Sequence, residues 1–194
     1  MLTLKTYLLT STITRNIELS DSKKVVEIQG SIPVTWNKDD IPGIGWNEDG
    51  DVGNNPRYVE AGHLSNAMTI AVLTEQDSDF PKWADVRKHF PMLDKAKVWM
   101  HSLGPGTYLP LHSDGFTNYK KEFGLTDERI ARIIIFCEDW QPGQISDVNH
   151  DLIYNWKAGD YVGWYDQTPH AAYNFSLMTR YAIMITGTVK PGNV

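Results

Sequence analysis

The stretch that decides the fold is Lys97-Val-Trp-Met-His-Ser-Leu-Gly104-Pro-Gly106-Thr-Tyr-Leu-Pro-Leu-His112. Residues 97–103 and 107–112 are predicted strands, and the Gly-Pro-Gly sequence between them is a strong turn signal. Further strands are predicted over 131–137, 144–148, 152–156, 160–165, 170–175 and 179–188. About eight short strands with turns between them favour an antiparallel double sheet or barrel.

The N-terminal half is predicted to add strands and helices to this sheet. Residues 2–14 and 24–35 are predicted strands, the second interrupted at Gly30. Residues 57–76 and a shorter segment from Asp79 to Phe90 are predicted helices, because apolar residues recur there at helical spacing. We expect these helices to pack against the outside of the sheet.

The length and composition predict one globular domain. With 194 residues, the chain is long enough for one sizeable core and too short for two ordinary domains. We therefore predict a single domain over 1–194, in which 1–96 supply supporting strands and helices and 97–190 the core.

The charge balance argues against a nucleic-acid partner. The formal net charge is −6, and no cluster of Lys and Arg stands out that would follow a phosphate backbone. Cys137 is the one cysteine, so an intrachain disulfide is excluded. The sequence has no signal-peptide pattern and no apolar run long enough for a membrane span, so we predict a cytoplasmic protein.

Three residues have the chemistry of a metal site. In an extended strand, residues i and i+2 share a face, which puts His112 beside Asp114. His170, in Asp166-Gln-Thr-Pro-His170, is the best third donor. Two histidines and one carboxylate are the ligand set of non-haem Fe(II) oxygenases, with the opposite coordination positions open.

Arg180 follows His170 by ten residues and carries a rigid fork that suits a carboxylate. Its strand parity is that of Ala182, Met184 and Thr186, and we interpret that face as lining a cavity. A buried arginine without a partner is costly, and a dicarboxylic ligand would supply the missing charge.

Other candidates are less specific. Tyr108 has the parity of His112 and is either a ligand-contacting residue or a core tyrosine. The polar segment 115–129 is either a substrate lid or an unstructured connection. His63, His101 and His150 lack partners at metal-ligand spacing, so we interpret them as structural or exposed.

Taken in order, His112-x-Asp114, His170 and Arg180 resemble the iron- and 2-oxoglutarate-dependent oxygenases. The stretch from Trp156 to His170 is similar to the aspartyl/asparaginyl β-hydroxylase branch, and Thr179-Arg180-Tyr-Ala-Ile looks like the matching strand of prolyl hydroxylases. The resemblance covers about 97–190 and implies a double-stranded β-helix, a jelly-roll and cupin-like core with helices on one side. Asp114 departs from the first branch, where that acidic ligand can be missing.

The resemblance implies a complete set of roles. His112, Asp114 and His170 would hold Fe(II), and 2-oxoglutarate would chelate the metal while its distal carboxylate pairs with Arg180. Oxygen would take the last position, and a C–H bond would be hydroxylated with release of succinate and CO2. Tyr108 would hydrogen-bond the cosubstrate.

Arg132 is a second candidate for the cosubstrate, because an arginine before a similar strand meets it in the aspartyl hydroxylase branch. The alternative is a surface cation that pairs with Glu128 or Asp139. Both nearest likenesses act on amino-acid side chains in polypeptides, so a peptide or protein substrate is favoured over a free small molecule.

Two other classes stay open. One is a cupin-like metal-binding enzyme or sensor that takes no 2-oxo acid and has no need of Arg180. The other is a catalytically silent jelly-roll binding module, which would not need the three ligands and the arginine together.

Overall fold

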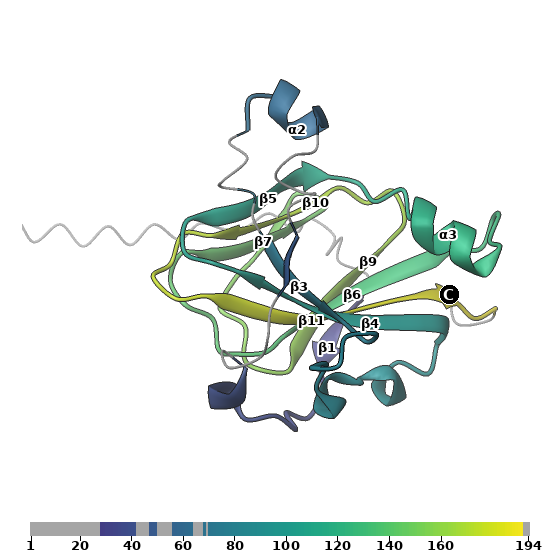
Figure 1. Ribbon diagram of the computed structural model, residues 1–194, viewed down its shortest axis with the longest axis horizontal. Coiled ribbons are helices and arrows are strands. Elements are labelled where there is room, and N and C mark those ends of the chain that lie inside the picture. Colours follow the sequence, from purple (N-terminus) through teal and green to yellow (C-terminus); the bar gives the residue numbers. More distant parts are fainter. Residues whose placement is uncertain (1–27, 42–46, 50–55, 64–67, 69, 192–194) are drawn as a thin grey trace, which may run out of the picture.

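The computed structural model describes residues 28–41, 47–49, 56–63, 68 and 70–191 of the chain (Figure 1). Its strands are β1 (Ile28–Ser31), β2 (Asn47–Asp49), β3 (Ile70–Thr74), β4 (Leu93–Leu103), β5 (Thr107–His112), β6 (Ile130–Phe136), β7 (Gln144–Val148), β8 (Asp151–Ile153), β9 (Asp160–Tyr165), β10 (His170–Asn174) and β11 (Arg180–Val189). The helices are α2 (Pro56–Glu60) and α3 (Thr117–Phe123), with 3-10 turns η1 (Lys38–Asp40), η3 (Lys82–Ala84) and η4 (Arg87–His89).

These strands form two antiparallel sheets. Within the described ranges, the larger sheet has the order β1-β9-β6-β11-β4-β3-β2 and the smaller sheet the order β5-β10-β7-β8. From β4 to β11 the chain crosses repeatedly between the two sheets, with β4, β6, β9 and β11 in the larger one. This crossing pattern is the jelly-roll, or double-stranded β-helix, so the predicted mainly β fold class is confirmed.

The interior between the sheets is aromatic and aliphatic. Phe136 and Trp156 stack there with ring centroids 3.9 Å apart and an interplanar angle of 8°. Ala182 and Met184 of β11 belong to the same buried cluster, together with Val148 of the smaller sheet. The even-numbered face of β11 therefore points into the jelly-roll, as predicted for the face that carries Arg180.

The odd-numbered face of β11 looks outward onto the segment around η3 and η4. Ile183 and Ile185 are fully buried in a cluster that includes Ala84, Val86 and Phe90. This is the contact predicted between the apolar side of 79–90 and the outside of the sheet. The secondary structure of that segment was predicted wrongly, because it forms two 3-10 turns separated by an extended Asp85 (φ −72°, ψ 91°).

The predicted helix over 57–76 is also wrong. Among the residues of this range that the structure describes, the helical ones belong to α2, and the chain leaves it through Gly62, whose φ of +87° is the left-handed conformation that ends helices. Residues Ile70–Thr74 instead form β3, which pairs with β4 in antiparallel register from Ile70↔Leu103 to Thr74↔Trp99. The run Ile-Ala-Val-Leu-Thr is short and apolar, so its sequence is compatible with a helix or a strand. Pairing with the edge of β4 selects the strand.

The predicted strands of the core are close to those observed. The bounds 107–112, 144–148 and 160–165 agree with β5, β7 and β9, whereas β4 starts earlier than predicted and β8 ends earlier. Gly30 lies within β1 rather than interrupting it, and a Cβ there would lie 2.5 Å from the Tyr161 hydroxyl. The predicted strand over 2–14 lies outside the described residues.

Two further elements frame one end of the jelly-roll. The segment 115–129, predicted as a polar loop, contains α3, and α2 lies beyond β5 and β10 in Figure 1. None of the described helices is long and apolar enough to cross a membrane.

Candidate metal centre

The three predicted metal ligands meet at one end of the smaller sheet. His112 is the last residue of β5 and His170 the first residue of β10, and the two are cross-strand partners. Asp114 follows β5 by two residues. One ligand atom from each residue lies within 4.8 Å of those of the other two.

The distances fit a shared metal after a small contraction. Asp114 Oδ2 lies 3.4 Å from His170 Nε2, and Asp114 Oδ1 lies 3.8 Å from His112 Nε2. Neighbouring ligands on one metal with bonds of about 2.1 Å lie about 3 Å apart. The donor set of two imidazoles and one carboxylate therefore suits a divalent transition metal.

Backbone carbonyls fix the orientation of both imidazoles. His112 Nδ1 lies 2.7 Å from the Pro110 carbonyl oxygen, and His170 Nδ1 lies 3.0 Å from that of Thr168. A carbonyl only accepts, so in each neutral ring Nδ1 carries the proton and Nε2 keeps its lone pair. This second contact of a ligating histidine is typical of metal sites.

His170 is neutral at physiological pH. Burial of the ring and the neighbouring His112 lower its pKa to about 4. Its ring also lies against that of Trp164, with centroids 4.3 Å apart. A neutral imidazole is the form that binds a metal, so no proton has to leave His170 near pH 7.

Arg132 lies beside the triad. Its Nη1 donates to Asp114 Oδ2 at 2.6 Å, and its Nε donates to Thr186 Oγ1 at 3.1 Å. The rings of Phe116 and Trp99 lie 4.7 and 5.1 Å from its guanidinium carbon. The surface pairing with Glu128 or Asp139 is therefore wrong, and the contact with the cosubstrate stays a prediction.

Arg180 is buried in the jelly-roll interior, with 2% of its surface exposed. It donates to the Ile145 carbonyl at 3.0 Å and to Ser146 Oγ at 2.6 Å, while its Nε has no partner among the described residues. Burial lowers its pKa to about 10, so it stays charged. No carboxylate of the described residues pairs with it, which leaves a buried positive charge uncompensated.

Tyr108 points away from the triad. His170 pairs with His112 and Ala172 with Leu109, so between these two pairs β10 has one residue and β5 has two, a bulge at Pro110 and Leu111. Proline cannot donate to the ladder, and strand prolines concentrate at bulges. The bulge puts Leu109, not Tyr108, on the face of His112.

The hydroxyl of Tyr108 instead meets His63. His63 Nδ1 lies 3.1 Å from Tyr108 Oη, and the His63 ring centroid lies 6.2 Å from that of Tyr58 in α2. The Tyr58 ring centroid is in turn 6.2 Å from that of His112. These aromatic residues lie beside the metal centre, and the contact of Tyr108 with the cosubstrate stays a prediction.

Two further interior residues present unpaired polar atoms near the triad. His101 of β4 is 1% exposed, and neither of its ring nitrogens has a partner among the described residues. Burial, reinforced by Arg180 and Arg132, lowers its pKa to about 3. Trp164 Nε1 is likewise buried and unpaired. The strand parity of His101 is the one available signal, because it is the cross-strand partner of Ala182.

A small cavity joins these groups to the triad. Its volume is about 40 Å³, and it is lined by His101, His112, His170, Trp164 and Ser146, among others. That volume accommodates about three water molecules. The interior thus presents unpaired ring nitrogens to a small space, with the Arg180 guanidinium behind Ser146.

Comparisons with known proteins find distant structural likenesses only. No protein-family model and no curated protein matches the chain. A Pseudomonas putida prolyl-4-hydroxylase is 14% identical with a TM-score of 0.47, over 78% of this chain and 96% of that one. A predicted oxalate decarboxylase from Thermotoga maritima is 11% identical with a TM-score of 0.44, over 76% and 96%.

A third similar structure, the cupin domain of Schizosaccharomyces pombe Cnp3, is 6% identical with a TM-score of 0.39, over 61% of this chain and 64% of that one. These likenesses are too distant to assign an activity. The jelly-roll follows from the strand order given above.

Proposed function

We propose that the protein is an Fe(II)- and 2-oxoglutarate-dependent hydroxylase. The observation that carries the proposal is the pairing of a His-Asp-His triad with an uncompensated buried arginine in the same jelly-roll. Ser146 links the two, because it accepts a hydrogen bond from Arg180 and lines the small cavity with His112 and His170.

Each residue of the site has a separate task in this proposal. His112, Asp114 and His170 would hold Fe(II) from one side, leaving the opposite positions for the keto acid and oxygen. With both bound, the metal would supply the oxidation of R–H by O2 and 2-oxoglutarate to R–OH, succinate and CO2. The protein's own residues bind, orient and exclude water.

The interior donors would bind the acid. Arg180 offers the positive charge for the distal carboxylate, and its Nε is unpaired. The ring nitrogens of His101 and the indole N–H of Trp164 are further buried groups that lack partners among the described residues. An anion in the cavity would relieve the cost of these unpaired groups, which is about 1–3 kcal/mol for each.

The cavity sets a condition on this function. A space of about 40 Å³ is too small for a five-carbon keto diacid, so side chains must move for it to enter. The Arg180–Ser146 hydrogen bond is the first that the acid would replace. Binding of 2-oxoglutarate should therefore be accompanied by a structural change in the interior.

We further propose that the oxidised group belongs to an amino-acid side chain in a peptide or protein, with a free small molecule as the alternative. The formal net charge of −6 gives no reason to expect a nucleic-acid substrate. Cytoplasmic localisation likewise stays a prediction.

The test is an anaerobic titration of Fe(II) with 2-oxoglutarate, followed by the metal-to-ligand charge-transfer absorbance. We expect the band in the wild type, its loss in His112→Ala, and its retention in His150→Asn, which alters an exposed histidine outside the triad. Absence of the band in the wild type, or its persistence in His112→Ala, would rule the proposal out.

A second candidate is a cupin-like metal-binding enzyme or sensor that uses no keto acid. The observation that favours it is the same small cavity, together with the two hydrogen bonds that Arg180 already makes to β7. This candidate predicts tight metal binding that depends on His112 and His170 but no charge-transfer band with 2-oxoglutarate. Lack of any metal binding would instead favour the silent binding module.

A further inference from the structure

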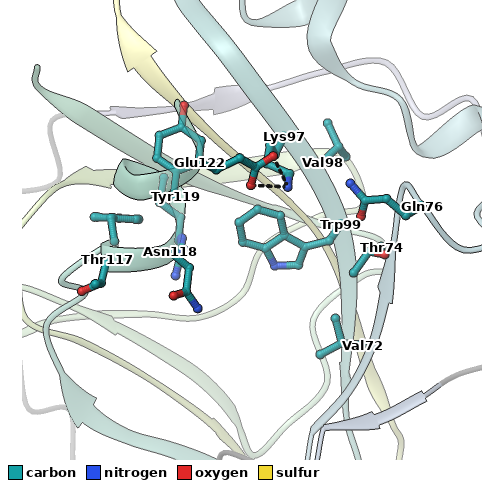
Figure 2. Close-up of a pocket in the computed structure, with 12 residues that line it drawn as sticks. Val72, Thr74, Gln76, Lys97, Val98, Trp99, Thr117, Asn118, Tyr119 and Glu122 are labelled. Atoms are coloured by element: carbon teal, nitrogen blue, oxygen red, sulfur yellow. Dashed lines mark hydrogen bonds and ion pairs between the residues drawn. The ribbon is translucent and has the colours of Figure 1, made fainter. Parts of the chain in front are cut away.

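A second and larger cavity lies beside the metal centre, between α3 and the strands β3 and β4. Its volume is about 520 Å³, within the range of about 300–1,000 Å³ that is usual for small-ligand sites. Figure 2 shows Trp99 at its middle, with Thr117 and Asn118 of α3 on one side and Thr74 and Gln76 on the other.

One guanidinium separates this α3 cavity from the triad. Arg132 lines both the α3 cavity and the small interior cavity, and its Nη1 holds Asp114 Oδ2 at 2.6 Å. Phe116, two residues after Asp114, lines the α3 cavity as well and lies against the Arg132 guanidinium. A molecule in the α3 cavity would therefore be separated from the proposed iron by the Arg132 side chain.

The charged groups of the α3 cavity are paired with each other or with the triad. Lys97 Nζ lies 3.0 and 2.9 Å from the two carboxylate oxygens of Glu122, an ion pair that ties β4 to α3 above Trp99 in Figure 2. Arg132 is neutralised by Asp114. Among the described lining residues, no charge is left over for a charged ligand.

The rest of the lining is apolar or polar and uncharged. Trp99, Phe116 and Val72 offer apolar surface, while Asn118 and Gln76 carry amides that both donate and accept hydrogen bonds. Convergent uncharged polar groups on an aromatic wall suit a ligand with an apolar body and amide or hydroxyl edges.

We propose that the α3 cavity binds the molecule to be oxidised and that the part it receives is uncharged, as in an amino-acid residue flanked by peptide bonds. The inference rests on the proposed hydroxylase function and narrows its substrate class. A zwitterionic amino acid is the competing ligand. Its carboxylate could pair with Lys97 and its ammonium group with Glu122, because breaking the half-exposed Lys97–Glu122 ion pair costs little.

The test uses the full chain labelled with 5-fluorotryptophan, in which the ¹⁹F signal of Trp99 is assigned with Trp99→Phe. The probes are N-acetylated, C-amidated leucine, phenylalanine and asparagine, each compared with its free amino acid. We expect a saturable shift of the Trp99 signal with at least one capped residue, at a dissociation constant on the order of millimolar. The free amino acid should bind about tenfold more weakly.

Two matched variants locate the binding. Asn118→Trp fills the α3 cavity and should abolish the shift, whereas Lys121→Trp adds the same bulk at an exposed α3 position outside the lining and should leave it. No shift with any capped residue, equal binding of the free amino acids, or binding that survives Asn118→Trp would each overturn the inference.

The charge-transfer titration of the same proteins keeps the two proposals apart. Asn118→Trp should retain the Fe(II)·2-oxoglutarate band, because Asn118 lines the α3 cavity and is not among the residues that line the small cavity at the triad. Absence of the charge-transfer band in the wild type would contradict the proposed hydroxylase function. The ¹⁹F titration would still report whether the α3 cavity binds uncharged amides.

Discussion

Arg132 Nη1 lies 2.6 Å from Oδ2 of Asp114, so a partly buried guanidinium holds the carboxylate of the triad in place. The same oxygen lies 3.4 Å from His170 Nε2. Arg132 is itself fixed by Thr186 and by the rings of Phe116 and Trp99. The carboxylate is thereby aimed between the two imidazoles, which reduces the ordering cost when a metal binds.

Replacing this guanidinium should weaken metal binding. Arg132→Met keeps an apolar stem between the rings but frees the Asp114 carboxylate to rotate, and we expect the affinity for Fe(II) or Co(II) to fall about tenfold or more. Calorimetric titration under anaerobic conditions measures it. Arg129→Met is the control, since that guanidinium stacks on Tyr165 at 3.4 Å. An affinity that stays the same or rises would mean that Arg132 competes with the metal for Oδ2.

The sequence was sufficient to predict the triad because its geometry is local. His112 and Asp114 are two residues apart at the end of a strand, and His170 starts another after a turn, so period-two alternation and chain order were enough to propose the set. The faces of β11 were predictable for the same reason. Tyr181, Ile183 and Ile185 form the more apolar face, whereas the other face carries Arg180 and Thr186 beside Ala182 and Met184.

The failures come from features that alternation does not encode. Regular alternation puts Tyr108 on the face of His112, but the bulge at Pro110 and Leu111 adds one residue to β5 and reverses the parity. The helix predicted over β3 is wrong because the sequence there suits either period, and pairing with the edge of β4 selects the strand. Arg132 and His101 acquire their roles from neighbours distant in the chain, which one sequence does not reveal.

Arg180 should contribute more to the binding of 2-oxoglutarate than to the stability of the fold. Arg180→Met replaces a buried cation by an apolar side chain of similar length, and we expect the free energy of unfolding without ligand to change by less than about 2 kcal/mol. Stabilisation by 2-oxoglutarate in the presence of Zn(II) should be lost, because the positive charge is gone. Thermal unfolding with and without the acid measures both effects.

The control for this change is Arg87→Met, an arginine of the outer face that pairs with Asp85 at 3.0 Å. It should keep the full stabilisation by 2-oxoglutarate. An unaltered response of Arg180→Met to the acid would show that the interior arginine does not bind it, and would favour the cupin-like alternative.

His101 should make the fold sensitive to acid. Its pKa is about 3 in the folded protein, below the ordinary value of 6.5, so between these values the unfolded chain binds a proton that the folded chain does not. The stability contribution of neutral His101 is complete above pH 6.5 and is lost as the pH falls toward 3. At pH 4.5 the loss amounts to about 3 kcal/mol.

Urea unfolding at pH 7 and pH 4.5, in the presence of EDTA, tests this expectation. His101→Gln carries no titrating ring. Between the two pH values its free energy of unfolding should therefore fall less than that of the wild type, and the two decreases should differ by about 3 kcal/mol. His170, whose pKa is lowered to about 4, titrates in both proteins and cancels in the comparison. Parallel pH dependences would contradict the burial of a neutral His101.

Gly163 is a position where the sheet tolerates no side chain. It lies in β9 between Ile28 of β1 and Ile133 of β6, its partners in the two flanking strands. A Cβ there would lie 2.8 Å from Ile133 Cγ1 and 2.9 Å from the Arg132 carbonyl oxygen. Because backbone must move to accept it, we expect Gly163→Ala to lower the free energy of unfolding by about 1–3 kcal/mol.

Denaturant unfolding measures this loss of stability, with Gly104→Ala as the control variant. At Gly104 the nearest atom to an added Cβ is Thr107 Cγ2 at 3.9 Å, an ordinary contact, so the change there should stay within about 0.5 kcal/mol. Because the Gly163 clash involves the Arg132 backbone, Gly163→Ala should also weaken metal binding through the Arg132–Asp114 contact. Equal stabilities of the two alanine variants would show that β9 and β6 are less closely packed than described.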